Sequence, residues 1–492
     1  MTKPATSPAS AAPVRSAREI ASLPGPSAWP VLGNLPQLQV SRMHQQLEQW
    51  ASRYGSLYRL RMGGRDALVV ADHALVAGVL RDRPDGFDRT ARLGVIGAEM
   101  GMKQGVFGAS GDVWRRQRRM VMAAFDPAHI KSYHPTLMTV AGRLERRWRK
   151  AAQAGTPIDL QADLMRYTVD AITGLAFGTD VNTLESDDEI IQRHLDLLLP
   201  ALFKRAFSLV PWWRLYRTSA DRELEAAMVE VNRAVDGFIA AARDRLAADP
   251  ARRAAPPNLL EAMIVAAQDD AQAGGHGGAP ISDAEIAGNV MTMLLAGEDT
   301  TANTIAWLIH LLVENPAALA RARDEVLAKL GAPPDLAFEA VRELDYVEAC
   351  AHEAMRLKPV APMILAQALR ETTVGDVRVP PGTVVFGLMR ADAVDEAHVD
   401  EAAAFRPERW LDGSSGFDLG SPKRVSMPFG AGPRICPGRY LALLEIRMAI
   451  ATLLASFDIV SLDTPDGAPP RENMAFTMEP VGLTLRLRER AS

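Results

Sequence analysis

The most informative stretch of this chain is Phe429-Gly430-Ala431-Gly432-Pro433-Arg434-Ile435-Cys436-Pro437-Gly438. Its glycines permit a tight turn or a bulge, and Pro437 suits the first residue of a helix running through Leu441 and Glu445. Cys436 would then lie at a helix N-terminus, where free backbone N–H groups and the helix dipole favour a thiolate. The segment therefore predicts a metal ligand or a nucleophile at position 436. The alternative is a buried structural cysteine, the commonest fate of a lone cysteine.

Two other functions fit this segment poorly. A dinucleotide-binding loop of the GxGxxG type needs a glycine where Ile435 stands. A cysteine nucleophile needs a histidine base, and the sequence identifies no positioned partner of that kind.

The segment resembles the signature of the cytochrome P450 family of haem-thiolate monooxygenases. The family's pattern, Phe-Gly-x-Gly-x-Arg-x-Cys-x-Gly, is matched at every fixed position. The resemblance implies that Cys436 is the axial ligand of the iron of haem b and that Arg434 meets a haem propionate. It places Phe429 beside the iron–sulfur bond, and Gly430 where backbone N–H groups approach the sulfur.

The resemblance also implies a fold that is mainly α with a minor β portion. In this cytochrome P450 fold the haem lies between a long central distal helix and the helix that follows the Cys loop. Local patterns agree, because helical periodicity dominates the middle of the chain, as at 219–249 and 315–329. A polar, Gly-rich stretch at 268–280 predicts a surface loop. Short strand-like runs lie at 57–62, 67–70, 374–379, 383–388 and 481–487.

One long helix can be placed from its boundaries. Ser282 and Glu285 form a capping-box pattern, and apolar residues continue from there to Val313. Asn315-Pro316 ends the run, because proline disfavours helical geometry in the residue before it. A helix of about 30 residues would be about 45 Å long and should cross the buried centre of the molecule.

The middle of this helix carries two adjacent acids and two threonines, in the sequence Ala296-Gly297-Glu298-Asp299-Thr300-Thr301. Taken alone, these residues could form a polar kink facing trapped water. By resemblance, Asp299 and Thr300 are the family's acid–alcohol pair, which delivers protons to dioxygen, and Ala296 and Gly297 leave room for it. The role of Glu298, the variable position of the motif, stays open.

Two further motifs match the family in its order along the chain. Trp114 and Arg118 lie one helical turn apart and are expected to reach a haem propionate, although the bare pattern also suits a solvated helix face. Glu353 and Arg356 resemble the family's Glu-x-x-Arg helix. With Arg409, they are expected to form a buried charge network of structural importance.

The sequence departs from the family at one site. Many members carry Arg or His after the Glu-x-x-Arg helix as a further propionate partner, and Ala366 stands near that place, followed by Gln367. The residue that takes over this role is not identified by the sequence.

Composition limits the function classes. Apolar residues make up 48% of the 492, and 55 basic residues face 60 acidic ones, which argues against a dedicated nucleic-acid binder. Two cysteines exclude a disulfide framework and suggest a reducing cytoplasmic location. No membrane span is predicted, because the longest charge-free apolar stretch, 300–313, is too short.

The chain is expected to hold a disordered lead-in at 1–23 and one haem-thiolate monooxygenase domain at 24–492, with no fused reductase. Electrons would come from a separate ferredoxin or flavodoxin with its NAD(P)H reductase. A basic face that would receive an acidic redox protein is predicted, although an ordinary solvated charge run is the alternative. Its members are Arg115, Arg116, Arg119, Lys423, Arg424 and Arg439.

Largely apolar segments are expected to line the pocket, which suits a lipophilic small-molecule substrate oxidised by O2. They lie at 93–107, 197–213, 291–296, 360–365 and 476–478. The alternatives are a peroxide-driven hydroxylase, a haem-thiolate sensor or binding protein without turnover, and an all-helical scaffold without haem.

Overall fold

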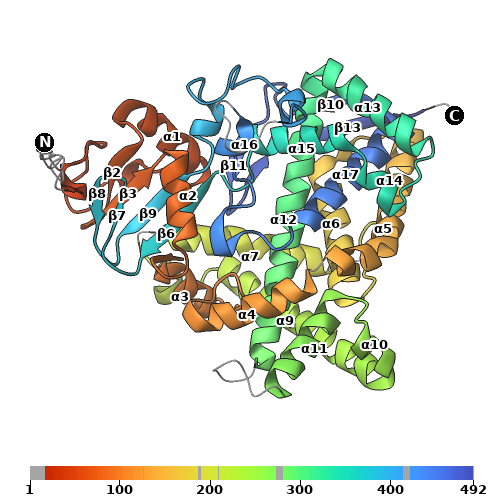
Figure 1. The fold of residues 1–492 in the computed structure, drawn as a ribbon, viewed down its shortest axis with the longest axis horizontal. Helices are drawn as coiled ribbons and strands as arrows, with labels where there is room; N and C mark the ends of the chain where they lie inside the picture. The colour runs from red at the N-terminus through yellow and green to blue at the C-terminus, as the bar shows by residue number, and fades with distance from the viewer. Residues whose placement is uncertain are drawn as a thin grey trace, which may run out of the picture.

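The computed structural model describes residues 17–125, 127–186, 190–208, 210–272, 281–413 and 421–490. Helices form most of the molecule, and the largest sheet lies at one end, on the left of Figure 1. This arrangement confirms the predicted fold class, mainly α with a minor β portion. None of the helices in these ranges is long and apolar enough to cross a membrane.

The α-helices differ widely in length. The longer ones are α1 (Met43–Tyr54), α4 (Gly111–Ala124), α5 (Pro127–Ala154), α6 (Leu160–Phe177), α7 (Ile190–Phe207), α9 (Ser219–Ala248), α11 (Leu259–Gln272), α12 (Asp283–Glu314), α13 (Pro316–Leu330), α15 (Asp345–Leu357) and α17 (Arg439–Ser456). The shorter ones are α2 (His73–Arg81), α3 (Ala91–Glu99), α8 (Trp212–Leu215), α10 (Pro250–Ala254), α14 (Phe338–Arg342) and α16 (Pro422–Val425).

The strands form four small sheets. The largest has the order β2-β3-β9-β6-β4, and its strands are β2 (Leu57–Met62), β3 (Arg65–Val70), β9 (Val384–Leu388), β6 (Met363–Ala368) and β4 (Phe87–Asp88). The others are β1 (Arg18–Glu19) with β8 (Val377–Val379) and β7 (Thr372–Val374); β10 (Phe457–Asp463) with β13 (Thr484–Glu489) and β5 (Ile158–Asp159); and β11 (Glu472–Met474) with β12 (Met478–Pro480).

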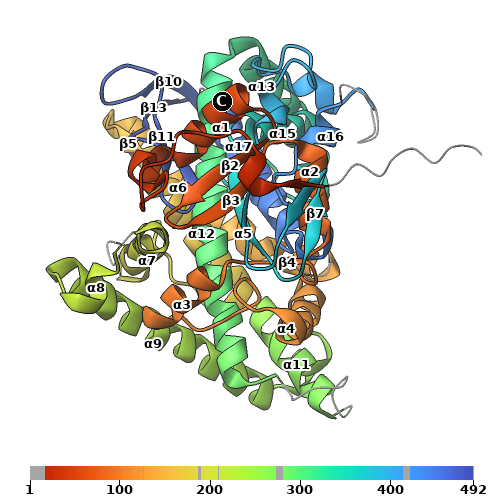
Figure 2. The ribbon, with the colours of Figure 1, turned by 90° about the vertical axis from the view of Figure 1, so that its left-hand side faces the viewer.

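Helix α12 organises the core. Ser282 and Glu285 form the predicted capping box, and the helix ends at Glu314 before its C-cap Asn315. Its 32 residues span about 48 Å. Most of them are buried, and the helix packs against α6, α15 and α17. It runs through the middle of the molecule, with the largest sheet on one side and most of the helices on the other (Figures 1 and 2).

Three predictions of local structure were wrong. Residues 18–23 were expected in the disordered lead-in, but they include strand β1, which pairs with β8. The side chains of Ile20 and Leu23 in this segment are buried in the core. Residues 1–16 lie outside the described part of the chain. The run at 374–379 is a hairpin between β7 and β8, because Gly375 turns with φ 59°. Residues 268–272 of the predicted loop continue α11, and 273–280 are not described.

The longest strands that the sequence analysis missed are β6 and β10. In β6 buried and half-buried residues do not alternate, since both faces of the strand pack on other parts of the protein. A strand of this kind lacks the two-residue periodicity by which half-buried strands are recognised.

Candidate active site

A cavity of about 820 Å³ separates the middle of α12 from the Cys436 loop. Thr300 and Ala296 line it from α12, and Cys436 and Phe429 line it from the loop. All five segments predicted to form pocket walls contribute lining residues, among them Phe107, Phe203, Met293, Val360 and Phe476. The lining is mainly apolar, which suits a large flat cofactor together with a lipophilic ligand.

The Cys436 loop is closed by its own backbone. The N–H of Cys436 donates to the carbonyl of Phe429 at 2.9 Å, and the N–H of Gly438 donates to the sulfur. Helix α17 begins at Arg439 with Gly438 as its N-cap. Pro437 therefore lies in the turn before the helix, and the prediction that it is the first helical residue is wrong.

Glycines permit this loop conformation at two positions. Gly430 and Gly432 have φ values of 75° and 71°, which other residues rarely adopt. A Cβ at Gly432 would lie 2.7 Å from Cα of Arg81 and from the carbonyl oxygen of Leu80. The loop therefore approaches helix α2 as closely as a glycine allows.

Burial raises the pKa of the Cys436 thiol, and this effect outweighs the Gly438 N–H and the positive charges of Arg118 and Arg439. The helix N-terminus alone therefore does not produce the thiolate that the sequence suggested. A metal ion bound to the sulfur would supply the missing stabilisation, because a coordinating thiol is deprotonated outright.

The two arginines predicted to meet haem propionates both reach the cavity. Arg434 pairs with Asp88 at 2.9 Å, donates to the carbonyl of Ala109 at 2.6 Å, and lies 4.7 Å from the ring centre of Trp114. Arg118 donates to the carbonyl of Ile435 at 2.6 Å. Trp114, Arg118 and Arg434 are thus brought together around the loop that carries the cysteine.

Four further arginines that line the cavity were missed by the sequence analysis: Arg65, Arg83, Arg89 and Arg92. Of these, Arg83 and Arg89 lie close enough to Arg434 for their charges to interact. Within the described chain, Nε and Nη2 of Arg83 and Nε of Arg434 are buried without a hydrogen-bond partner. Burial lowers the pKa of Arg434 to about 10, and it lowers the pKa of Arg89 strongly, with Arg83 and Arg434 adding to the effect. Asp88 is the buried carboxylate that faces this positive charge.

An excess of buried guanidinium groups is costly unless anions compensate it. The two propionates of a haem are such anions, and the unpartnered N–H groups would donate to them. The residues present therefore fit a haem, with the cysteine sulfur as ligand for its iron. Ala366 itself is fully buried, and the Oε1 atom of Gln367 accepts from the N–H of Ala91 at 3.0 Å.

On the other side of the cavity, the structure separates the predicted acid–alcohol pair. Thr300 lines the cavity, and its hydroxyl donates to the carbonyl of Ala296 at 2.7 Å. Asp299 instead accepts from Asn303 at 2.6 Å and from the hydroxyl of Thr477. Asp299 is not among the residues that line the cavity, so only the threonine of the pair faces it.

Burial raises the pKa of Asp299 against the opposing effect of these two hydrogen bonds. Burial also raises the pKa of Glu298 far above its usual range, and the charges of Asp196 and Asp299 add to this. In the part of the chain that is described, Oε1 of Glu298 has no hydrogen-bond partner. Burial and these neighbouring charges both favour the neutral form of the Glu298 carboxyl.

Gly297 lines the cavity, but its missing side chain serves helix packing. A Cβ there would lie 3.0 Å from Ile172 of helix α6. The glycine thus lets α6 approach α12 at the wall of the cavity, which Ile172 also lines.

Glu353, Arg356 and Arg409 meet in one buried network. Arg356 donates to both carboxylate oxygens of Glu353 at 2.7 and 2.9 Å, and Arg409 donates to the same carboxylate at 3.0 Å. Trp410, not identified from the sequence, donates to it at 2.8 Å. Arg356 also donates to the carbonyl of Ala393 at 2.5 Å, so the network fixes the segment before the Cys436 loop.

The predicted basic face is only partly present. Arg115 pairs with Asp85 and Asp112, and Arg116 is largely buried and pairs with Glu285 at 3.3 Å. Arg116 therefore points to the start of α12 and does not belong to an exposed docking surface. Lys423, Arg424 and Arg439 remain at least partly exposed, as does Arg119.

Comparisons with known proteins agree with this geometry. The family model "Cytochrome P450" matches residues 23–487. Cytochrome P450 97B2, chloroplastic, of Glycine max is 25% identical over 461 residues, covering 85% of this chain and 78% of the relative. The steroid 17-alpha-hydroxylase/17,20 lyase of Pan troglodytes is 26% identical over 450 residues, covering 89% and 86%.

A self-sufficient cytochrome P450 monooxygenase of Phanerodontia chrysosporium is 28% identical over 454 residues, which cover 90% of this chain but 40% of the relative. The family match extends over nearly all of the described residues, and it includes the cysteine loop, the arginine cluster and the long helix. The chain therefore belongs to the cytochrome P450 family, and it is a haem-binding monooxygenase.

Proposed function

We propose that this monooxygenase inserts one atom of O2 into a C–H or C=C bond of a lipophilic organic molecule. The observation that carries the proposal is the mainly apolar cavity of about 820 Å³, which has Cys436 on one wall and Thr300 on the other. Such a cavity has room for a substrate beside a haem and excludes bulk water from the reacting bond.

The cofactor would be held by residues on three sides. Cys436 would bind the iron, and Phe429 and Gly430 would shape the loop around the sulfur. Arg434 and Arg118, with Trp114, would hold the propionates. Arg83 and Arg89 would act as the further propionate partners that position 366 does not supply, and the unpartnered N–H groups of Arg83 support this role. Thiolate-ligated haem iron supplies the activation of dioxygen when it is bound.

Protons for the reaction would come through α12. The Thr300 hydroxyl lines the cavity and can exchange its bond to Ala296 for a bond to a water or to the reacting molecule. Asp299 lies behind it, and its raised pKa allows the carboxyl to take up and release protons. Burial raises the pKa of Glu479, and the nearby charge of Asp299 adds to this effect. Glu479 also lines a separate polar cleft of about 790 Å³.

Electrons would come from a ferredoxin or flavodoxin with its NAD(P)H reductase. The exposed or half-exposed Arg119, Arg424 and Arg439 support docking of an acidic partner near the cysteine loop. A reducing compartment such as the cytoplasm is part of the proposal, and it is supported by the two cysteines, which form no disulfide.

The test is an isotope experiment on the haem-loaded enzyme. Lipophilic compounds that shift the iron spin state are incubated with ¹⁸O2, NADH and a generic ferredoxin and reductase. The proposal expects products with one ¹⁸O atom and NADH consumption tied to product. Products whose oxygen comes from water, or products formed only when hydrogen peroxide replaces NADH, would overturn it.

A further inference from the structure

A cluster of His73, Asp392 and His398 lies outside the active-site cavity and takes no part in the proposed reaction. His73 is the first residue of helix α2. Asp392 begins the short helix η4 (Asp392–Val394), and His398 follows in the same connecting segment. The fold therefore brings together side chains that are more than 300 positions apart in the sequence.

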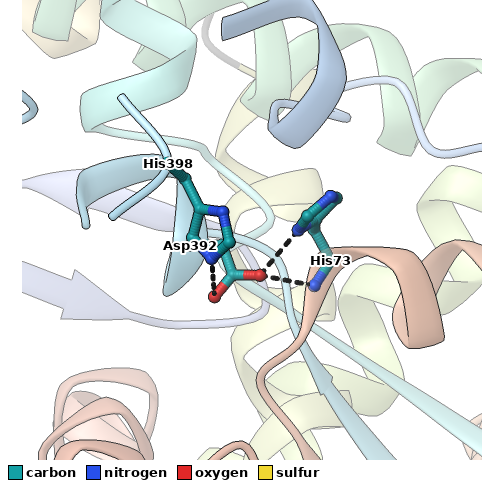
Figure 3. A group of neighbouring side chains, drawn as sticks. All are labelled: His73, Asp392 and His398. Carbon is teal, nitrogen blue, oxygen red and sulfur yellow. Dashed lines mark hydrogen bonds and ion pairs between the residues drawn. The ribbon is translucent and has the colours of Figure 1, made fainter. Parts of the chain in front are cut away.

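Each imidazole lies beside a different oxygen of the Asp392 carboxylate (Figure 3). Nδ1 of His73 lies 2.7 Å from Oδ2 of Asp392, and Nε2 of His398 lies 3.6 Å from Oδ1. The two rings are 5.2 Å apart, edge to face. One potential ligand atom from each residue lies within 4.8 Å of the other two.

These separations suit a small divalent ion. Zinc binds imidazole nitrogen and carboxylate oxygen at about 2.0–2.2 Å, so tetrahedral ligand atoms lie about 3.3 Å from one another. The two imidazoles lie 2.7 and 3.6 Å from the two carboxylate oxygens, and one ligand atom from each residue lies within 4.8 Å of the others, so the separations are near that value. Two imidazoles and one carboxylate favour zinc and its neighbours over magnesium or calcium, which prefer oxygen ligands alone.

The exposure and the charge of the cluster also suit a bound cation. The side chains of His73 and Asp392 are mostly buried, and that of His398 is 30% exposed, so an ion could enter from solvent and keep a water as its fourth ligand. The cluster carries the charge of one carboxylate when both histidines are neutral. In the described ranges, it is the only group of His, Cys, Asp and Glu with this geometry.

We propose that His73, Asp392 and His398 form a binding site for a divalent transition-metal ion of the zinc class. The ion ties the N-terminus of α2 to the segment 392–398. That segment receives a hydrogen bond from Arg356 at Ala393, and the other end of α2 packs against Gly432 of the cysteine loop. Occupancy therefore stabilises the support of the Cys436 loop without entering the haem cavity.

The competing role for the carboxylate is to cap a helix. Asp392 also accepts the backbone N–H of His73 at 2.7 Å, which satisfies a free donor at the start of α2. A carboxylate used only in this way would give no selective affinity for zinc, so the two roles are separated by metal binding.

The experiment uses tag-free, haem-loaded enzyme that has been treated with a chelator. Equilibrium dialysis against ZnCl2, with zinc measured by mass spectrometry, is expected to give one tightly bound equivalent in the wild type. His398→Ala and His73→Ala should weaken it at least about tenfold, since even outer partners of metal ligands have effects of that size. His129→Ala, which changes a histidine on α5, should bind zinc as the wild type does.

The unfolding temperature should rise with zinc in the wild type and not in His398→Ala. Zinc-edge X-ray absorption on the wild type gives a readout that does not depend on any variant folding, and it should show two imidazoles and oxygen ligands. A wild type that takes up no zinc at micromolar concentrations, equal binding by all variants, or a ligand set without imidazole would each overturn the proposal.

Discussion

Replacing Glu353 by alanine tests the buried network most sharply. The carboxylate accepts from Arg356, Arg409 and Trp410, and the side chains of Glu353 and Arg356 are fully buried. Removing one partner of a buried ion pair costs about 3–5 kcal/mol, because the other charge stays in the interior without compensation. Domains are stable by only about 5–15 kcal/mol, so the loss takes a large share of the total.

The chain contains a matched control with the same spacing. Glu339 and Arg342 also stand three residues apart on a helix, but both side chains are about 60% exposed and their closest atoms are 3.5 Å apart. Glu339→Ala should leave the denaturation midpoint unchanged, since exposed pairs of this kind contribute little.

Urea denaturation followed by circular dichroism, together with the yield of haem-loaded protein, measures both variants. We expect Glu353→Ala to unfold at much lower urea or to accumulate without haem. Glu353→Gln keeps one acceptor oxygen and should fall between the wild type and Glu353→Ala. Equal midpoints for Glu353→Ala and Glu339→Ala would refute the reasoning.

Three further predictions address the site. Thr300→Ala should keep NADH consumption but lower the amount of product per NADH, and an unchanged ratio would contradict the role given to its hydroxyl. Arg434→Leu should speed haem transfer to apomyoglobin about ten- to hundredfold, as expected for lost bonds to a charged group of about 1.5–3 kcal/mol, whereas the exposed Arg119→Leu should not. Burial raises the pKa of Glu445 to about 8. The folded state therefore holds this proton more tightly than the unfolded chain, whose pKa is about 4.3, and stability should fall as pH rises between these values. In Glu445→Gln the fall should be smaller in denaturation midpoints measured from pH 5 to 8, and an identical pH profile would contradict the assignment.

The parts of the site that sequence could predict are those set by local rules. The cysteine loop needs positive φ at Gly430 and Gly432, and the ends of α12 need a capping box and a proline stop. Such features are encoded within a few neighbouring residues, so the sequence alone predicts both the loop and the long helix.

The remaining parts depend on contacts between distant segments. Arg83 and Arg89 reach the cavity because β4 pairs with β6, and nothing near them in the sequence signals a role. The direction of Asp299 is set by Thr477, which is 178 residues away. The helix after the cysteine begins at Arg439, two residues beyond Pro437, which the local preference of proline for a helix start does not predict.

The central claim is that the sulfur of Cys436 binds haem iron, and the absorption spectrum of the reduced enzyme with carbon monoxide tests it most directly. The wild type and Cys350→Ser should both show the red-shifted Soret band of a thiolate-ligated haem, since Cys350 is buried in helix α15 away from the cavity. Cys436→Ser should lose that band. A wild-type spectrum typical of histidine-ligated haem, or a band that survives in Cys436→Ser, would contradict the account.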